Sequence, residues 1–404
     1  MTAVALSVNK VASFPDGGGH FWVYLQYALG LRQLGCDVYW LEQLRPVGDP
    51  DRRAYIIATF QDRMKRFGFD GHTLLYDTVE GELRFVGSTQ PEAEAVLRRV
   101  DVLLNFHYAI DPRLLACARR TALVDIDPGL LQFWMSTGEL DVPPHDCYLT
   151  TGETVGTAAA LFSDCGLQWT HIRPPVCLDR WPFTYEPGAD AFTTVSSWSS
   201  ASWLKVQRNG QTVLVDNTKR ISFLEFAELP CHTRQRLELA LYLLDRDPPA
   251  GQARPKQAEK DAQDRALLER QGWRVRDSRD VTGSPTAYAA YIRRSRGEFS
   301  AAKPSCMAFQ NAWVSDRTVA YLASGKPAVV QHTGASAFLP DGEGMFRFRS
   351  LTEAAQALET INRDYPRQCR AARELAETHF DARRVLETAL NAALSTQPAG
   401  SGVA

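Results

Sequence analysis

The segment WVSDRTVAYLASGKPAVVQHTG, residues 313–334, carries the clearest structural pattern in the chain. Ser315 is a typical N-terminal cap of a helix, and the apolar residues after it recur at helical spacing. Gly325 and Pro327 end this helix, since glycine accepts the left-handed conformation at a helix end and proline cannot continue a helix. The apolar run 328–330 then predicts a buried strand, so the segment is a helix–strand unit of an α/β sheet.

The start of this predicted helix is polar, with Ser315, Asp316 and Arg317 in sequence. The first N–H groups of a helix have no partner within the helix and attract anions. A guanidinium adds charged hydrogen bonds of a geometry that suits phosphate. We therefore expect this helix start to bind a phosphate group.

Alternation of strands and helices extends over the whole chain. The first half predicts a strand at 3–14, a glycine loop at 17–19, a helix at 21–34, a strand at 37–42 and a further helix at 153–163. The second half predicts strands at 237–244 and 297–300, a helix at 258–271 and helical residues at 351–395. The polar stretch 186–190, which contains proline and glycine, separates the two series. Two such series predict a two-lobed α/β protein with domains at 1–182 and 190–380.

The composition narrows the classes of partner. The 404 residues carry a formal net charge of −2, which favours neither a nucleic acid nor an anionic membrane as partner. Eight cysteines are scattered without a C-x-x-C pair, and the N-terminus has no secretion signal, so we expect reduced thiols in a cytoplasmic protein. No apolar run reaches the ~18 residues of a membrane span, and no residues have metal-ligand spacing.

The run GGGHFWVYLQYALGLRQLGCDVYWLE, residues 17–42, resembles the first motif of a bacterial group of GT-B-fold glycosyltransferases that includes natural-product enzymes. Residues 125–129, 152–153 and 296–344 resemble the same group in the same order. The resemblance implies two Rossmann-like lobes with an interdomain cleft, and a C-terminal helix at 381–395 that crosses back to the first lobe. It also implies transfer of a sugar from a nucleotide-diphospho-sugar to a hydroxyl or amine of a small-molecule acceptor, as in antibiotic biosynthesis.

The second lobe is expected to bind the nucleotide-sugar donor without a metal or other cofactor. Arg317, with Lys219 or Lys303, would take up the charge of the leaving diphosphate. Many relatives carry an acidic residue where this chain has Ala320, so Glu298 and Asp316 are expected to contact the ribose or base instead. The full set of expected donor-binding residues is Ser197, Lys219, Glu298, Lys303, Ser315, Asp316, Arg317, Gly334 and Ser336.

The first lobe is expected to supply the catalytic groups. His20 is a candidate general base, since imidazole titrates near neutral pH, or else a histidine that only packs at the helix start. Asp16 is the competing carboxylate in the same loop. Asp127 follows a predicted strand and either binds an acceptor hydroxyl, orients His20 or forms a turn before Pro-Gly.

Five further residues of the first lobe are expected to bind the acceptor: Gly18, Gly19, Trp22, Trp134 and Glu153. The glycines let a ligand approach the backbone closely. The two tryptophans would stack on the acceptor, although aromatic residues at such spacing also occur in cores. Glu153 either faces the cleft or stabilises a helix start.

Two other functions fit the same residues. A nucleotide-sugar epimerase on this fold needs acid and base groups on both faces of the sugar, and Asp127 and Glu153 are available. A non-catalytic helper protein of the same fold would be expected to lose its polar donor site, whereas Lys303, Asp316 and Arg317 are present. For a transferase, the sequence predicts that Arg317→Ala lowers turnover strongly and leaves the fold intact.

Overall fold

The chain opens with the strand–helix–strand unit that the sequence predicts. In the computed structural model, β1 (Ala3–Val8) and β2 (Asp37–Gln43) pair in parallel, and α1 (Gly18–Gln33) connects them. The structure describes residues 1–199, 203–208, 211–244 and 255–395. These residues divide into two units, one formed by 1–177 with the segment from Phe380 onward and the other by 178–379.

The first unit is built on an eight-stranded sheet with the order β4-β3-β2-β1-β5-β6-β7-β8. Its remaining strands are β3 (Thr73–Val79), β4 (Glu82–Phe85), β5 (Val102–Asn105), β6 (Thr121–Asp125), β7 (Cys147–Thr150) and β8 (Trp169–His171). Its other helices before the C-terminal segment are α2 (Pro50–Arg66), α3 (Gln90–Leu97), α4 (Pro112–Leu115) and α5 (Leu130–Ser136). Only β3 and β4 pair in antiparallel fashion, so the carboxyl ends of β2, β1, β5 and β6 lie along one edge.

The last described helix, α14 (Ala382–Ser395), belongs to the first unit and packs on α1. Gly30 of α1 makes this approach possible. A Cβ at Gly30 would lie 2.5 Å from Cδ1 of Leu386 and 2.8 Å from Cβ of Ala382. The backbone N–H of Val176 donates to the carbonyl of Phe380, and that of Ala382 to the carbonyl of Val176, which ties the start of α14 to this unit.

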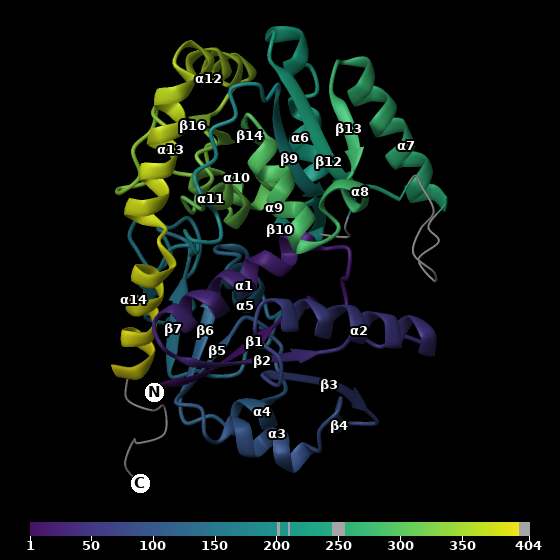
Figure 1. Ribbon diagram of the computed structural model, residues 1–404, viewed down its shortest axis with the longest axis vertical. Helices are drawn as coiled ribbons and strands as arrows, with labels where there is room; N and C mark the ends of the chain where they lie inside the picture. Colours follow the sequence, from purple (N-terminus) through teal and green to yellow (C-terminus); the bar gives the residue numbers. More distant parts are fainter. Residues whose placement is uncertain (200–202, 209–210, 245–254, 396–404) are drawn as a thin grey trace. The chain divides into compact units, whose positions relative to one another are not determined.

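The second unit contains a six-stranded parallel sheet with the order β13-β12-β9-β14-β15-β16 (Figure 1). Its strands are β9 (Ala191–Ser197), β12 (Arg236–Tyr242), β13 (Arg274–Asp277), β14 (Gly297–Ser300), β15 (Ala328–Gln331) and β16 (Met345–Phe348). The chain moves outward from β9 to β13, then returns to β14 on the other side. The strand order therefore reverses between β9 and β14, and ligands of open α/β sheets bind at the carboxyl ends of such a pair.

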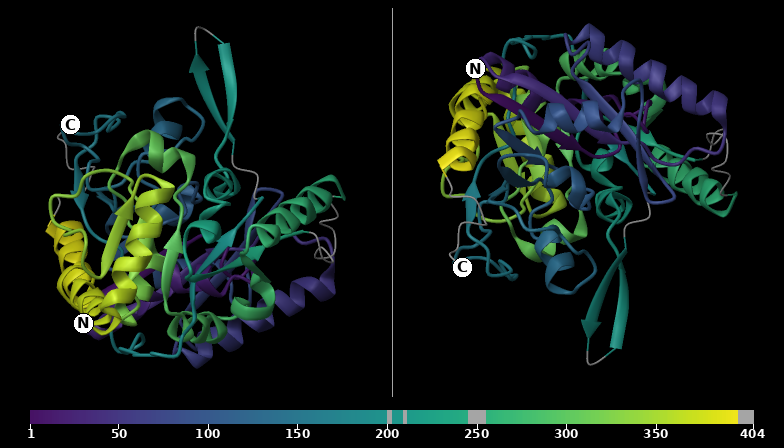
Figure 2. Two further views of the ribbon diagram at one scale, coloured as in Figure 1. Left: turned by 90° about the horizontal axis from the view of Figure 1, so that it is seen from above. Right: turned by 90° about the horizontal axis from the view of Figure 1, so that it is seen from below.

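Helices cover both faces of this sheet. They are α6 (Lys219–Glu225), α7 (Pro255–Arg270), α8 (Ser278–Thr282), α9 (Pro285–Arg294), α10 (Pro304–Phe309), α11 (Asp316–Ala323), α12 (Leu351–Arg363) and α13 (Tyr365–His379), with a 3-10 turn at Leu229–His232. An antiparallel hairpin of β10 (Trp203–Arg208) and β11 (Gln211–Asp216) extends away from the rest of this unit (Figure 2). The hydrophobic core of this unit is rich in aromatic residues, with Phe299 stacked on Phe348 at a centroid distance of 5.3 Å.

The predicted fold class is confirmed, because each unit is built on a mostly parallel sheet covered by helices, with β4 as an antiparallel edge strand of the first sheet. The predicted strand at 297–300 coincides with β14. The predicted helix at 153–163 is wrong: these residues form turns, and Gly156 has a φ of 71°, outside the helical region. None of the described helices combines the length and apolar character that crossing a lipid bilayer requires.

The contact between α1 and α14 predicts that Gly30→Val destabilises the protein. The added side chain would overlap Ala382 and Leu386, and such overpacking typically costs about 1–3 kcal/mol. Urea unfolding should therefore show a lower midpoint for this variant. Gly48→Val is the matched control, since a Cβ at Gly48 meets no atom within 4 Å. Equal midpoints for the two variants would contradict this account of the helix contact.

Candidate functional site

The helix start that the sequence singles out forms as predicted. Ser315 is the N-cap of α11, and its hydroxyl accepts a hydrogen bond from the N–H of Arg317 at 3.3 Å. The helix ends before Gly325, which has a φ of 70°. The start of α11 follows β14 in the chain and precedes β15, so it lies beside the point where the strand order reverses.

Arg317 is buried in the second unit and holds three elements together. Its Nε donates to Oε1 of Glu298 on β14 at 2.6 Å, and Nη1 donates to the carbonyl of Val195 on β9 at 2.8 Å. Nη2 donates to the hydroxyl of Ser300. Burial lowers the pKa of Arg317, but the nearby Glu298 carboxylate helps to raise it overall. Three of its five N–H groups are thus engaged inside the protein.

Glu298 does not lie where a ligand would meet it. Its side chain is 0 % exposed, and its Oε1 accepts the bond from Arg317, while Oε2 is buried and makes no hydrogen bond within the described residues. The expected contact from Glu298 to ribose or base is therefore corrected: this carboxylate positions Arg317. The expectation that Arg317→Ala leaves the fold intact is corrected as well, because that change would leave a buried carboxylate without its counter-ion.

Two lysines bring further positive charge to the same place. Lys219 is the first residue of α6, and Lys303 is the N-cap residue of α10. Burial lowers the pKa of Lys219 well below its usual value, and the neighbouring charges of Arg317 and Lys303 lower it further. The three predicted phosphate contacts therefore converge, and they repel one another. A multiply charged anion among them would relieve this repulsion.

The loop before Lys219 contains two polar side chains, Asn217 and Thr218, that are only partly hydrogen-bonded within the described residues. The side-chain carbonyl of Asn217 accepts a hydrogen bond from the N–H of Ser305 at 2.8 Å, which joins this loop to α10. Within the described residues, Nδ2 of Asn217 and the hydroxyl of Thr218 are buried and make no hydrogen bond. Buried polar atoms that lack a partner are costly in a folded protein and are common where a ligand binds.

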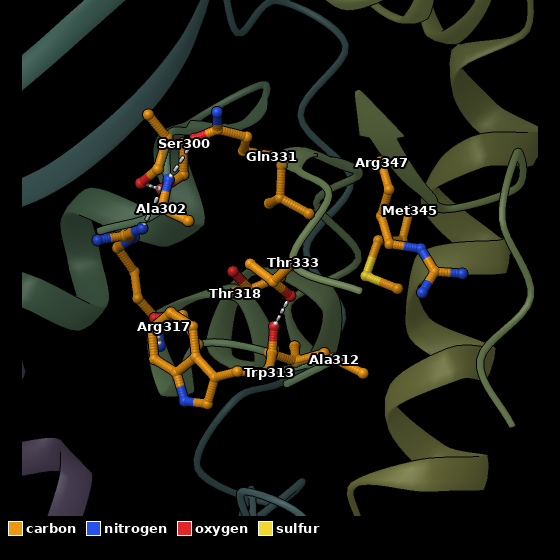
Figure 3. A pocket seen from close by; sticks show the side chains of 14 residues that line it. Ser300, Ala302, Ala312, Trp313, Arg317, Thr318, Gln331, Thr333, Met345 and Arg347 are labelled. Carbon is orange, nitrogen blue, oxygen red and sulfur yellow. Dashed lines mark hydrogen bonds between the residues drawn. The ribbon is translucent and has the colours of Figure 1, made fainter. Parts of the chain in front are cut away.

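A pocket opens beside Arg317, with about 430 Å³ of empty space that is partly open to solvent (Figure 3). Trp313 lies at its wall, and the hydroxyl of Thr333 fixes the backbone there by donating to the carbonyl of Trp313 at 2.8 Å. The lining residues are Ser300, Ala301, Ala302, Ala312, Trp313, Val314, Ser315, Arg317, Thr318, Val330, Gln331, Thr333, Met345 and Arg347. The pocket combines an aromatic ring, a guanidinium and several hydroxyl and amide groups, as ligand pockets do.

The remaining expected donor residues lie outside this lining. Gly334 has a φ of 131°, and a Cβ there would come within 2.5 Å of the carbonyl oxygen of Gln310, so packing explains this glycine. The hydroxyl of Ser336 accepts the N–H groups of two residues that follow it, which is a local turn. Ser197 is exposed at the end of β9, and Asp316 is half-buried in the first turn of α11.

His20 lies in the first turn of α1 in the first unit. Its Nε2 is 2.8 Å from the carbonyl oxygen of Asn9, and a carbonyl only accepts, so Nε2 carries the proton and Nδ1 has the lone pair. Burial lowers the pKa of His20, and the Lys10 charge also lowers it, while Asn9 and Asp127 oppose this shift. The imidazole is therefore neutral at pH 7, as a general base requires.

Asp127 is close enough to His20 to influence the pKa of the imidazole. The turn before Pro-Gly, which was one alternative for Asp127, is formed by the side chain of Asp125 instead. Oδ1 of Asp125 accepts the N–H of Asp127 at 3.0 Å, which is an Asx turn. Asp125 is 0 % exposed, and burial raises its pKa to about 7. The half-buried Asp16, in the loop before α1, acts electrostatically on Arg63, whose guanidinium also donates to the carbonyl of Pro15.

The expected acceptor residues differ in accessibility. Trp22 is only 6 % exposed and packs edge-on against Phe67, so its expected stacking on an acceptor is corrected to a core contact. Trp134 on α5 and Glu153 after β7 are half-buried. Gly18 is buried and Gly19 is half-buried at the start of α1.

Three ionisable residues at the carboxyl edge of the first sheet were not predicted as site residues from the sequence. They are Lys10, Arg45 and His107. Each lies two residues after the end of a strand in the first sheet. That position is a usable signal only once the strand ends and the strand order are known, because both decide which side chains meet.

Comparison with known proteins supports the fold. No family model matches this chain, and no curated protein matches it. Three solved structures that do match are HepE of Anabaena in complex with UDP and glucose, AviGT4, a glycosyltransferase involved in avilamycin A biosynthesis, and an α-glucosyltransferase in complex with UDP and DNA. Their identities to this chain are 12 %, 16 % and 9 %, with TM-scores of 0.57, 0.53 and 0.55. Each match covers 97 % of this chain, and 99 %, 96 % and 99 % of the other chain.

At these identities the similarity establishes the fold. Two Rossmann-like units with these sheet orders are the two-lobed GT-B architecture of glycosyltransferases. The roles of individual residues rest on the geometry described above.

The buried pair predicts that Arg317→Ala destabilises the second unit. Removing one partner of a buried ion pair typically costs about 3–5 kcal/mol, because the other charge stays buried. Urea unfolding of Arg317→Ala should show this loss. The matched control is Arg367→Ala, which removes an exposed ion pair with Glu343 and should change stability little. Equal stability of the two variants would contradict the structural role of Arg317.

Proposed function

We propose that this protein is a glycosyltransferase that moves a sugar from a nucleotide-diphospho-sugar to a hydroxyl or amine of a small-molecule acceptor. The observation that carries the proposal is the convergence of Lys219, Lys303 and Arg317 at the strand-order reversal of the second sheet. The GT-B fold supports it, as do the names of similar structures, which include complexes with UDP and with UDP-glucose.

The second unit would bind the donor. In the transfer step, the acceptor oxygen forms a bond to the anomeric carbon, and the bond from that carbon to the diphosphate breaks. Its electron pair leaves with the nucleoside diphosphate, and the three cations stabilise the negative charge that develops there. These side chains would supply this stabilisation without a metal ion. The pocket beside Trp313 and Arg317 has a composition suited to the nucleoside, with an aromatic ring beside polar groups.

The first unit would bind the acceptor and take its proton. Nδ1 of His20 has the lone pair that a general base needs, and Asp127 acts on its charge. Asp16 is the alternative base in the same loop. A small natural product is our preferred acceptor, because AviGT4 takes part in avilamycin A biosynthesis and the net charge of −2 does not favour nucleic acid. The eight cysteines, all in described parts of the chain, form no disulfide, and we propose a cytoplasmic location on this ground.

The proposal is tested by incubating the purified protein with a panel of nucleotide sugars and analysing the products by mass spectrometry and chromatography. Transfer, or release of nucleoside diphosphate by slow donor hydrolysis, would support a glycosyltransferase. An isomerised nucleotide sugar would identify an epimerase instead. Absence of nucleotide binding across the panel would indicate a non-catalytic helper protein.

The cation cluster predicts that Lys219→Met and Lys303→Met weaken nucleoside diphosphate binding. A hydrogen bond to a charged group contributes about 1.5–3 kcal/mol, so each change should raise Kd roughly ten- to a hundredfold. Because burial and the neighbouring cations lower the pKa of Lys219, a bound diphosphate should raise this pKa and cause proton uptake. Isothermal titration calorimetry in buffers of different ionisation enthalpy measures both effects.

Lys260→Met, on the exposed side of α7, is the control for these two variants. Its Kd should match that of the unmodified protein. Retained proton uptake in Lys219→Met would refute the assignment of that proton.

The lowered pKa of His20 predicts a specific pH dependence. A base must be neutral, so activity should fall only when pH drops through a pKa below the usual histidine value of ~6.5. His20→Ala should lower kcat by about 10²-fold or more and remove this acid limb from the pH profile. His232→Ala, at an exposed position of the second unit, serves as control. Unchanged kcat in His20→Ala would direct attention to Asp16.

A further inference from the structure

Four neighbouring strands of the first sheet are each followed, two residues after their end, by an ionisable side chain. These side chains are Arg45 after β2, Lys10 after β1, His107 after β5 and Asp127 after β6. The strands are parallel and adjacent in the order β2-β1-β5-β6, so their carboxyl ends lie side by side. We call these four side chains the carboxyl-edge row.

Lys10 is held in an unusual backbone conformation. Its φ is 64°, and a residue with a side chain adopts this left-handed region at a cost of about 1–3 kcal/mol. Two hydrogen bonds fix the loop that contains it: Ala12 donates to Oε1 of Glu42 at 2.7 Å, and the backbone N–H of Arg45 donates to the hydroxyl of Ser13 at 3.0 Å. The second bond also ties the backbone at Arg45 to the loop that contains Lys10. Strain of this kind concentrates at functional sites.

The row carries an excess of positive charge. Although Lys10 is exposed at the surface, partial desolvation and the charge of Arg45 lower its pKa, whereas Asp127 raises it. Burial, Lys10 and Arg45 lower the pKa of His107 to about 4, so His107 is neutral at pH 7. Within the row, the two cations Lys10 and Arg45 thus outnumber the one carboxylate, Asp127. In the described part of the chain, Nδ1 of His107 is buried and makes no hydrogen bond.

The start of α1 adds to the positive potential at this place. The bond between His20 and the carbonyl of Asn9 joins the first turn of α1 to the residue before Lys10. This 16-residue helix has no acidic residue in its first turn and no side-chain cap at Gly17. Its first N–H groups therefore have no side-chain cap, and together with the helix dipole they attract negative charge.

We propose that the acceptor carries an oxyanion, a phosphate or carboxylate group, that binds to Lys10 and Arg45 in the carboxyl-edge row. This inference rests on the proposed function and adds a substrate class to it. The oxyanion would anchor the acceptor beside His20, so that its hydroxyl proton passes to Nδ1 as the oxygen bonds to the sugar. Lys10 and Arg45 would contact the substrate directly, and the neutral His107 would accept or donate one hydrogen bond at the same group.

The diphosphate of the donor carries oxyanions of the same kind. The test therefore distinguishes binding of an acceptor oxyanion to the row from binding of the donor diphosphate. Histidine labelled with ¹³C at Cε1 gives NMR signals for His20 and His107 in the full-length protein. Inorganic phosphate and malonate are titrated separately, at constant pH and ionic strength, with and without a saturating nucleoside diphosphate. UDP, GDP, dTDP and ADP are compared beforehand to choose the one that binds most tightly.

We expect phosphate, malonate or both to shift the two histidine signals saturably, whether or not the nucleoside diphosphate is bound. Lys10→Gly and Arg45→Met should each raise the apparent Kd at least tenfold. Lys10→Gly suits the left-handed conformation, so weaker binding in that variant would not come from misfolding. Lys10→Arg should retain binding, and Lys65→Met, at an exposed position of α2, should leave it unchanged.

Three outcomes would overturn the proposal. The first is an absence of any saturable shift with both anions. The second is loss of the phosphate shift once the nucleoside diphosphate saturates the protein, which would assign the row to the donor. The third is equal Kd values for Lys10→Gly and Lys65→Met. None of these measurements requires sugar transfer, so their failure leaves the proposed glycosyltransferase activity to be judged by its own assay.

Discussion

The buried pair of Arg317 and Glu298 is the constraint on which the second unit depends. It joins α11 to β14, and the further bond to the carbonyl of Val195 adds β9. These elements meet where the strand order reverses, so the pair sets the backbone geometry of the proposed donor site. A guanidinium that is already oriented loses little freedom when a ligand arrives, which favours binding. The same residue therefore contributes to stability and lines the pocket.

Electrostatic repulsion is the property that the two units share. In the second unit, Lys219, Lys303 and Arg317 lie close together, and in the first unit Lys10 lies near Arg45. Like charges at short range cost free energy unless an anion offsets them. Burial first, and then this repulsion, lower the pKa values of Lys219 and Lys10. Both places lie at the carboxyl edge of a parallel sheet, which is where open α/β proteins bind their ligands.

Local patterns in the sequence predicted much of the fold. Ser315, Gly325 and Pro327 defined α11, and the run 297–300 defined β14, since caps and apolar periodicity act over a few residues. The same reasoning failed at 153–163, where the left-handed Gly156 interrupts the apolar run. It also predicted that Glu298 and Trp22 contact ligands, although both are buried. Exposure depends on tertiary packing, which a local sequence pattern does not contain.

The sequence by itself determined the two-lobed α/β architecture and the polar start of α11. The tertiary structure decided which side chains meet. Only the strand order shows that Arg45, Lys10 and His107 share one edge, although they are tens of residues apart. Likewise, only packing shows that Glu298 is buried and pairs with Arg317 through Oε1, and that Nδ1 of His20 holds the lone pair. The physical reason is that charge and burial depend on distances in space, whereas helix caps and strand periodicity depend on neighbours in the chain.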